Sequence, residues 1–591
     1  MPPVGEAVLR REPIHMHRTI ALRMFPVLAL VSTLAASPAL AGYEFGEEGG
    51  SLSGSYLAGR YAGKLRDIDF AARYFEQALR DDPNNSVLIE KVFIFAVSEG
   101  DMNAAEEYAI RVLSFNSQHR MARIVLGLRD LRLKHYAEAR EHFRKAAYTP
   151  VGELTSALLT AWSYAGEGNQ KEALKALDKL DSNEALANFK AFHSALIADY
   201  LDLPLRAENF YKKAYEQAGT SLRVVQAYGN FLERTGRKNE ARKVYEQFLA
   251  SADHNPLVRE ALAEIDANRT VKPFIGTVMQ GIGEGMFSIA SALSDDQGLE
   301  VAVMYTQLAL SVGNNRDIAL TLLGDLYEDM QNYQRAIAAY QSIPSTSLLR
   351  SNAEIEIAVN LQKLEKSDEA KAQLKAVIAK DPKSRDAILT LGNIYRGNEE
   401  FSQAAEAYSQ DIALIPVPTR NDWTLFYYRG IAYERMKQWE KAESDLRRAL
   451  ALEPDQPMVL NYLGYSMVEK KINLLEAMEM VRKAVELKPN DGYIVDSLGW
   501  VHYQLGEYDE AVKQLEHAVE LKPADPVIAD HLGDAYWRVG RQLEARFQWQ
   551  HAKDNKPEVA DLERIEKKLK SGLAEDTPVT PVEVKTNQIK G

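Results

Sequence analysis

Small and large residues return in the same order at intervals of about 34 residues along most of this chain. In one clear copy, the pair Leu391-Gly392 is followed by Ala404 and then by the large Tyr408. Small residues let two antiparallel helices approach closely, and the large residue fills the space between neighbouring pairs. One pair cannot bury its own apolar face, so the repeat predicts a stack of helix pairs.

This pattern resembles the tetratricopeptide repeat family over nearly the whole chain that follows the N-terminal segment. The resemblance implies an all-α fold, an α-solenoid of about fourteen helix-turn-helix units that forms a right-handed superhelix in two stacks. A fold of this kind is compatible with many functions, so the function has to be argued from its surfaces.

The first forty residues differ in composition from the rest. Arg18 and Arg23 precede the apolar run Met24 to Ala36, and small residues then lead to Ala41. A positive flank, a short apolar core and small residues before a scissile bond predict a secretory signal peptide over residues 1–41, cleaved after Ala41. A retained membrane anchor is the alternative, although the run is short for a bilayer of about 30 Å.

The repeat register breaks once, which suggests a domain boundary. The predicted segments are an N-terminal repeat array at 42–254, a capping or linker break at 255–280, a C-terminal array at 281–557, a capping helix at 558–571 and a disordered tail at 572–591. Pro273 to Leu293 holds a single charge, Glu284, and several glycines. This stretch is interpreted as a buried first helix of the next repeat, or alternatively as a helix in peripheral contact with a membrane.

Composition excludes several kinds of chemistry. The net charge is −13 and the chain has no cysteine, so nucleic-acid binding, thiol catalysis and Cys-ligated metals are not expected. The eleven histidines are scattered, and the sequence contains none of the usual hydrolase, zinc or phosphate-loop motifs. We therefore expect no enzyme activity, no cofactor and no metal. A two-carboxylate glycosidase arrangement of Asp530 and Asp534 is conceivable, but an open surface offers no means of raising one pKa.

The family resemblance also implies which first-helix positions line an inner groove. Carried onto the last four repeats, it selects Tyr427, Asn461, Tyr465, Tyr493, Asp496, Trp500, Tyr503, Asp530, Asp534, Trp537 and Arg538. The corresponding positions of the second to fifth repeats are mostly aliphatic, as at Ile124, Leu128, Leu158 and Leu196.

Aromatic side chains interleaved with carboxylates are typical of recognition surfaces. The alternative is that Trp500 and Trp537 only pack between adjacent first helices. The groove departs from the family's pattern for acidic peptide tails, because Asp496 and Asp530 replace basic and amide residues. A basic, polar or sugar-like ligand suits it better.

The stretches around Tyr465, Trp500 and Trp537 also resemble large exported repeat proteins of Gram-negative bacteria, especially alphaproteobacteria, that are linked to cell-envelope integrity. The resemblance implies a non-enzymatic periplasmic scaffold whose partners are envelope proteins or peptides. The alternative is a glycan-binding adaptor in polysaccharide or peptidoglycan assembly that uses the same aromatic surface.

Overall fold

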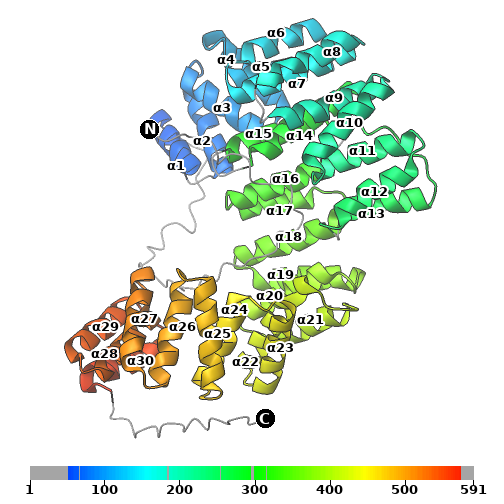
Figure 1. Cartoon of the computed structure of the whole chain (residues 1–591). Coiled ribbons are helices and arrows are strands. Elements are labelled where there is room, and N and C mark those ends of the chain that lie inside the picture. The colour runs from blue at the N-terminus through cyan, green and yellow to red at the C-terminus, as the bar shows by residue number, and fades with distance from the viewer. Residues whose placement is uncertain are drawn as a thin grey trace. The chain divides into compact units, whose positions relative to one another are not determined.

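The structure is a computed structural model that describes residues 51–64, 67–182, 186–252, 255–294, 298–313 and 316–573. It contains thirty α-helices and no strand within those ranges (Figure 1). The all-α class expected from the repeat is confirmed, and successive helices pack as antiparallel pairs. The predicted signal peptide 1–41 lies outside the described residues, as does the predicted tail beyond Leu573.

The chain divides into two compact bodies, and the division falls between Val377 and Ile378, inside one helix. The N-terminal body is built from α1 (Leu52–Lys64), α2 (Ile68–Asp81), α3 (Ser86–Glu99), α4 (Met102–Phe115), α5 (Arg120–Arg132), α6 (Tyr136–Ala146), α7 (Pro150–Gly166), α8 (Gln170–Ala176), the short 3-10 helix Leu177–Ser182, α9 (Ala187–Tyr200), α10 (Pro204–Ala218), α11 (Leu222–Arg234), α12 (Lys238–Leu249), α13 (Pro256–Asp266), α14 (Val278–Ala292), α15 (Leu299–Val312), α16 (Arg316–Asp329), α17 (Tyr333–Gln341), α18 (Arg350–Lys363) and most of α19 (Ser367–Lys380).

The C-terminal body holds the last five predicted repeats and the predicted capping helix. Its elements are α20 (Arg385–Gly397), α21 (Phe401–Ala413), the 3-10 turn Arg420–Asp422, α22 (Trp423–Arg435), α23 (Trp439–Leu452), α24 (Pro457–Glu469), α25 (Leu474–Leu487), α26 (Gly492–Gln504), α27 (Tyr508–Leu521), α28 (Pro526–Arg538), α29 (Gln542–Asp554) and α30 (Val559–Ser571). The first helices α24, α26 and α28 of successive pairs contact one another, so residues along them share one face of the body.

The small and large residues of the repeat meet inside each helix pair. A Cβ atom built at Gly324 would lie 2.4 Å from the ring of Tyr340, and one at Gly533 would lie 2.5 Å from the indole of Trp549. Tyr340 and Trp549 are completely buried. The glycine therefore lets the second helix place a bulky ring directly against the first helix, which is the packing reason predicted for the repeat.

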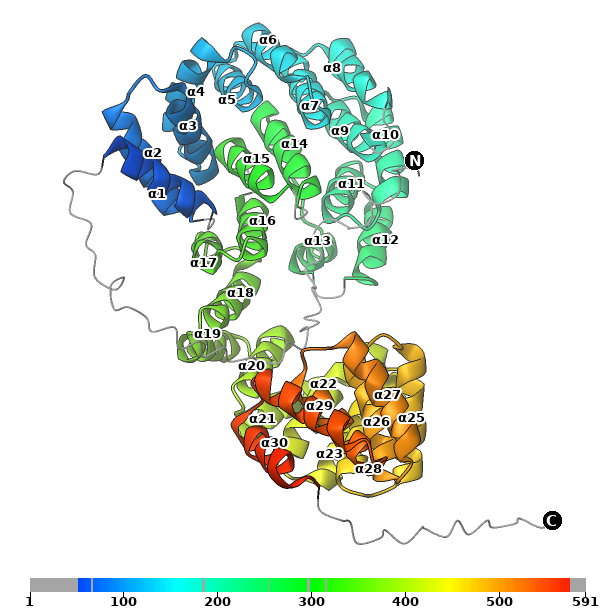
Figure 2. The same ribbon diagram turned by 90° about the vertical axis from the view of Figure 1, so that its left-hand side faces the viewer.

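The inner side of the N-terminal body is filled by its own chain. Helices α14 and α15 lie inside the arc formed by α3 to α12 (Figure 2), where α14 contacts α7 and α9 and α15 contacts α3. The aliphatic inner-face residues predicted in the early repeats are all buried there: Ile124, Leu128, Leu158 and Leu196. Apolar inner positions are thus explained by an internal helical occupant.

Helix α14 reaches this position through its glycines. A Cβ atom at Gly281 would lie 2.3 Å from the indole of Trp162, and one at Gly283 would lie 2.5 Å from the Cα atom of Gly313. The one charge of this helix, Glu284, is completely buried and accepts a hydrogen bond of 2.9 Å from Arg223 Nε. The interpretation of this stretch as a buried helix is confirmed, and the alternative of membrane contact is wrong because its apolar residues face protein.

The predicted break at 255–280 does not coincide with the division between the bodies. The structure divides at Val377 instead, because α14 and α15 belong to the same packed interior as α3, α7 and α9. Arg335 of α17 also forms ion pairs with Asp69 and Glu99, which lie far earlier in the sequence. The loss of repeat register therefore coincides with the segment that leads α14 and α15 into the interior of the N-terminal body.

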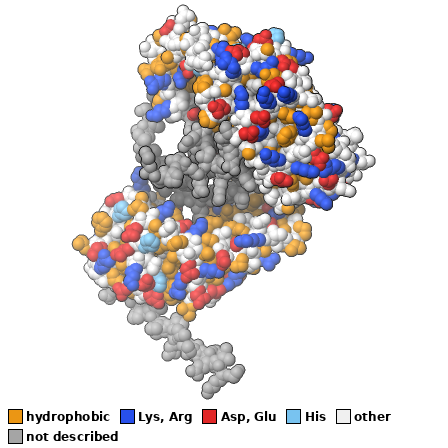
Figure 3. Space-filling view, turned by 45° about the horizontal axis from the view of Figure 1, so that its top comes forward, with side chains coloured by type: hydrophobic (Ala, Val, Ile, Leu, Met, Phe, Trp, Pro, Cys, Tyr) orange, Lys and Arg blue, Asp and Glu red, His pale blue; other side chains and the backbone are white. Residues whose placement is uncertain are grey.

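Two properties of the described surface bear on its partners. None of the helices in the described ranges has the length and apolar character needed to cross a membrane. On the face seen in Figure 3, acidic and basic side chains are interspersed and form no large area of one sign. That the chain does not bind nucleic acid stays a prediction.

Candidate functional site

The inner-face cluster lies on α26 and α28 of the C-terminal body, and we define it as Asp496, Trp500, Tyr503, Asp530, His531, Asp534, Trp537 and Arg538. Helix α28 is fixed at its start by Asp525, whose carboxylate accepts hydrogen bonds from the backbone amides of Val527 and Ile528 at 2.9 and 3.1 Å. Pro526 occupies the first turn, where no intrahelical donor is lost. These signals set the rotation of α28 and hence the face on which its acids lie.

Trp500 is the centre of a stacked aromatic group. Its indole stacks on Tyr503 with ring centroids 4.7 Å apart and on His531 with centroids 4.1 Å apart. The indole Nε1–H donates a hydrogen bond of 2.7 Å to Glu469 of α24. Arg538 donates one of 3.2 Å to the hydroxyl of Tyr503. The group thus ties three successive first helices together while Trp500 and Tyr503 stay half-exposed.

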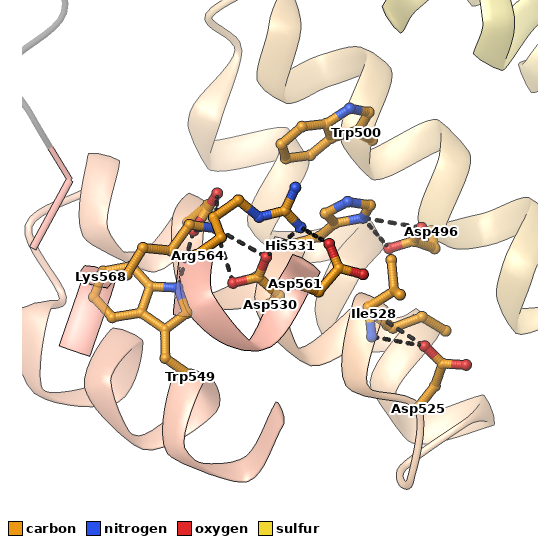
Figure 4. Close-up of polar contacts among 12 residues, drawn as sticks. Asp496, Trp500, Asp525, Ile528, Asp530, His531, Trp549, Asp561, Arg564 and Lys568 are labelled. Carbon is orange, nitrogen blue, oxygen red and sulfur yellow. Dashed lines mark hydrogen bonds and ion pairs between the residues drawn. The ribbon is translucent and has the colours of Figure 1, made fainter. Parts of the chain in front are cut away.

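His531 is held by a buried carboxylate. Its Nδ1 lies 2.9 Å from Oδ1 of Asp496, and both side chains are buried (Figure 4). Burial by itself lowers the pKa of His531, but the carboxylates of Asp496, Asp530 and Asp534 outweigh it, so the pKa lies above its ordinary value. A protonated imidazole against the Trp500 ring is further favoured by cation–π attraction.

The acids of α28 are covered by α30. Lys568 donates hydrogen bonds of 2.8 and 2.9 Å to the two carboxylate oxygens of Asp530 and one of 2.7 Å to Asp534. Arg564, one turn earlier, donates a hydrogen bond of 3.0 Å to Asp530 (Figure 4). Asp530 is 1% exposed and Lys568 is 8% exposed. These carboxylates are therefore paired inside the protein.

Asp534 has a second, structural partner. Its Oδ1 accepts a hydrogen bond of 2.9 Å from Nε1 of Trp549, the large residue of the same repeat. An equivalent bond runs from the Tyr340 hydroxyl to Asp325, at 2.7 Å. A polar residue after the repeat glycine thus satisfies the polar atom of the buried ring from the second helix. Burial raises the pKa of Asp534, although the ammonium of Lys568 opposes this.

The eleven predicted groove residues fall into three sets. Half-exposed side chains are Asn461, Tyr465, Trp500, Tyr503, Trp537 and Arg538. Buried side chains, which correct the prediction, are Tyr427, Asp496, Asp530 and Asp534. Tyr427 is buried by Trp423, Tyr428 and Tyr462, whose rings lie around it. Tyr493 is 40% exposed but lies at the start of α26, where the ammonium of Lys522 lies over its ring.

Trp537 is half-exposed, but it also packs against α29 and the end of α30. Its ring centroid is 5.4 Å from that of Trp549, and a Cβ atom at Gly572 would lie 2.1 Å from its indole. Part of the predicted alternative, that this tryptophan is a packing residue, is therefore correct.

Sequence reasoning missed His531, Arg564 and Lys568. The family positions select residues 530 and 534 but pass over His531, and the prediction of a polar capping helix at 558–571 names no partner for its charges. One signal was present: Arg564 and Lys568 stand four residues apart, as do Asp530 and Asp534, so one basic face matches one acidic face.

Two observations bear on other chemistry. Among the residues that the structure describes, no group of three or more His, Asp or Glu side chains is placed to hold a metal ion. A hollow of about 750 Å³ lies in the N-terminal body beside Gln307, Tyr327 and Arg335, apart from every predicted groove residue. That the chain has no enzyme activity stays a prediction.

Comparison with known proteins identifies the repeats. Models of the tetratricopeptide repeat match residues 319–344, 355–413 and 423–456, and a TPR repeat model matches residues 499–540. The chain therefore carries tetratricopeptide repeats in this region, as the sequence predicted, and such repeats generally bind other proteins. The number of repeats stays a prediction.

Three similar proteins span different biology. The TPR repeat-containing protein PA4667 of Pseudomonas aeruginosa is 30% identical over 197 residues, which is 33% of this chain and 32% of that protein. The E3 ubiquitin-protein ligase CHIP of Arabidopsis thaliana is 29% identical over 123 residues, 20% of this chain and 42% of that protein. Yeast Tom70 has a TM-score of 0.32 at 13% identity, with 88% of this chain and 95% of that chain covered. This chain thus spans less than half the length of these two curated relatives.

Proposed function

We propose that the protein is a non-enzymatic scaffold of the periplasm that binds cell-envelope proteins through the inner-face cluster of its C-terminal body. The observation that carries the proposal is the Trp500–Tyr503 stack, half-exposed and flanked by Arg538. Rigid aromatic rings lose little conformational entropy on binding, and such anchors each contribute about 2 kcal/mol or more at interfaces.

The periplasmic location rests on the sequence of the N-terminal segment. Its positive flank, short apolar run and small residues before Ala41 have the form of a secretory signal. The chain has no cysteine to be oxidised after export.

A protein partner is favoured over a glycan by the way Trp500 is held. Sugar rings bind by stacking on a free aromatic face. Tyr503 and His531 both stack on this indole, with planes inclined by 4° and 15°. The part of Trp500 that a partner can contact is therefore the edge of a fixed ring. The polar groups beside it belong to Glu469 and His531.

The experiment is crosslinking in intact cells followed by capture of the full chain from the envelope fraction. Trp500→Ala removes the centre of the aromatic stack, and we expect specific crosslinked proteins to disappear. Trp439→Ala is the matched control, because it removes a half-buried tryptophan from a second helix, where its ring lies against Lys470.

Two results would contradict the proposal. An identical set of crosslinked proteins for wild type, Trp500→Ala and Trp439→Ala would mean that the cluster docks no protein. Loss of polysaccharide binding with Trp500→Ala, while the crosslinked proteins are retained, would favour the glycan-binding adaptor instead. Fractionation of the same cells tests the location, since a periplasmic chain is released with the periplasmic contents.

A further inference from the structure

Helix α30 packs on the last repeat of the C-terminal body through one face only. Its inward residues Ile565 and Lys568 are buried, whereas Glu563, Lys567 and Lys570 on its other sides are exposed. It contacts α29 along its length, and its basic residues reach the acids of α28. The helix thus covers the two acids that α28 contributes to the inner-face cluster, Asp530 and Asp534.

The contact between α30 and Asp530 has the same form as a contact between two repeats of the array. In the preceding repeat, Asp496 receives its hydrogen bond from His531, a residue of the next first helix. Asp530, the equivalent acid of the last repeat, receives its bonds from Arg564 and Lys568. Helix α30 therefore occupies the place that a further first helix would take, with its basic residues on the acids of α28.

Helix α30 is held by ion pairs to buried acids and by few buried apolar side chains. Ile565 is its one apolar side chain that is almost completely buried, at 1% exposure, and Leu569 and Leu573 are only partly buried. By contrast, α14 of the N-terminal body buries Ile282, Met286 and Phe287. A terminal helix held by few apolar contacts opens more readily than the array it covers.

We propose that this end of the C-terminal body is a helix-binding site, occupied in the resting chain by α30 and taken in the complex by a basic amphipathic helix of the partner protein. The partner helix carries two basic residues four apart with an aliphatic residue between them, as Arg564, Ile565 and Lys568 do. The inference rests on the proposed function, because it names the partner class for the same cluster. Charge complementarity with Asp530 and Asp534 carries it.

Occupation by α30 has a measurable consequence. A short connection gives α30 a millimolar-range effective concentration at the site, so a helix added from solution competes against it. The apparent affinity of that helix is reduced by the fraction of molecules in which the site is open. Weakening the hold of α30 should therefore strengthen binding of an external helix.

The test uses the full chain and a fluorescent peptide that copies residues 558–573, with anisotropy as the readout. Lys568→Glu places a carboxylate against Asp530 and Asp534 and should release α30, so we expect the peptide to bind at least tenfold more tightly than to wild type. Lys567→Glu makes the same charge change on the exposed side of α30 and should leave binding at the wild-type level.

A peptide in which Arg564 and Lys568 are both replaced by Glu should bind neither protein. If Lys568→Glu does not fold by circular dichroism, Arg564→Glu is used, because the Arg564 side chain is 52% exposed and its loss is tolerated more easily. A folded variant that binds the peptide no more tightly than wild type overturns the proposal. A dimer of the released variant in light scattering also overturns it, since a second copy would then be the occupant.

Failure of this inference and failure of the proposed function are distinguishable. If Trp500→Ala loses its crosslinked proteins but the peptide does not bind, the scaffold proposal stands and the helix-binding site does not. If the peptide binds Lys568→Glu tightly but Trp500→Ala keeps all crosslinked proteins, the helix-binding site exists and the proposed envelope partners bind elsewhere.

Discussion

The imidazole of His531 lies flat against the indole of Trp500, with ring centroids 4.1 Å apart and planes inclined by 15°. The same imidazole is hydrogen-bonded to Asp496, so His531 contacts both the acids and the aromatic rings of the cluster. A change in its charge therefore acts on both. This relationship makes the C-terminal body sensitive to pH in a direction that can be worked out.

Stability of the C-terminal body should fall as pH rises above neutrality. Burial opposes protonation of His531, but its neighbouring carboxylates raise its pKa above the ordinary value near 6.5. The native state therefore binds more protons than the unfolded state in this window, and stability decreases with pH there. The contribution is complete below about pH 6.5 and is lost as pH passes the folded pKa. Hydrogen exchange in α26 and α28 measures it.

His531→Gln should remove most of this pH dependence, because glutamine does not titrate. His517→Gln is the control, since the side chain of His517 is 48% exposed and lies outside the cluster. If the wild type and His531→Gln show the same slope of exchange protection between pH 6 and 9, then Asp496 does not hold a protonated His531.

A second buried histidine should make the N-terminal body sensitive to acid. His193 of α9 is completely buried, and neither ring nitrogen has a hydrogen-bond partner. Burial lowers its pKa to about 4, with the nearby Glu284 opposing the shift. The unfolded state binds the proton first as pH falls, so stability drops from about pH 6.5 to 4 by about 3 kcal/mol. His193→Leu should abolish this loss and be neutral or stabilising at pH 8.

Thermal unfolding at pH 5 and pH 8 measures the effect of His193→Leu, and hydrogen exchange in α7 and α9 assigns it to the N-terminal body. An equal loss of protection on acidification in wild type and His193→Leu would show that other groups cause the acid sensitivity.

The repeat pattern predicted the pairing of helices well, because its signal is local. A glycine and a large residue at a fixed spacing meet within one pair, as at Gly533 and Trp549, and nothing distant alters that contact. The same reasoning failed at 255–280. Whether α14 starts a new stack or enters the first one depends on Trp162 and Arg223, which lie far away in sequence.

The sequence predicted which residues of the candidate site share a helix face, but it did not predict which of them are covered. The family positions select Asp496, Trp500 and Tyr503 together, and these residues do lie along one helix, although Asp496 is buried. Whether an acid on that face is free depends on what covers it, and the cover of Asp530 comes from α30. A capping helix is recognisable from sequence by its polar character. Its partners are recognisable only when its charges are compared with those of the repeat that it covers.

The glycine at the helix pair contact should be intolerant of even one methyl group. In Gly533→Ala the new Cβ atom would lie 2.5 Å from the completely buried indole of Trp549, which is also bonded to Asp534. Overpacking of this kind costs about 1 to 3 kcal/mol. Gly397→Ala is the matched control, because nothing lies within 4 Å of its added Cβ atom. That control should be neutral or stabilise α20 by up to about 1 kcal/mol. Urea unfolding of the C-terminal body compares the two, and equal stabilities would contradict the packing argument.

The ion pair between Arg223 and Glu284 should be essential to the N-terminal body, because it anchors α14 inside the arc. Its side chains are 8% and 0% exposed, and Arg223 also lies over the ring of Phe274 at 4.5 Å. Arg223→Ala leaves the carboxylate of Glu284 buried without this partner, which costs about 3 to 5 kcal/mol. Arg242→Ala breaks an ion pair with Asp266 whose side chains are 34% and 64% exposed, and it should cost less than about 1 kcal/mol. Thermal unfolding and hydrogen exchange in α14 measure both. If Arg223→Ala and Arg242→Ala destabilise the body equally, α14 is held by its apolar contacts and its glycines, and the buried charge is incidental to its placement.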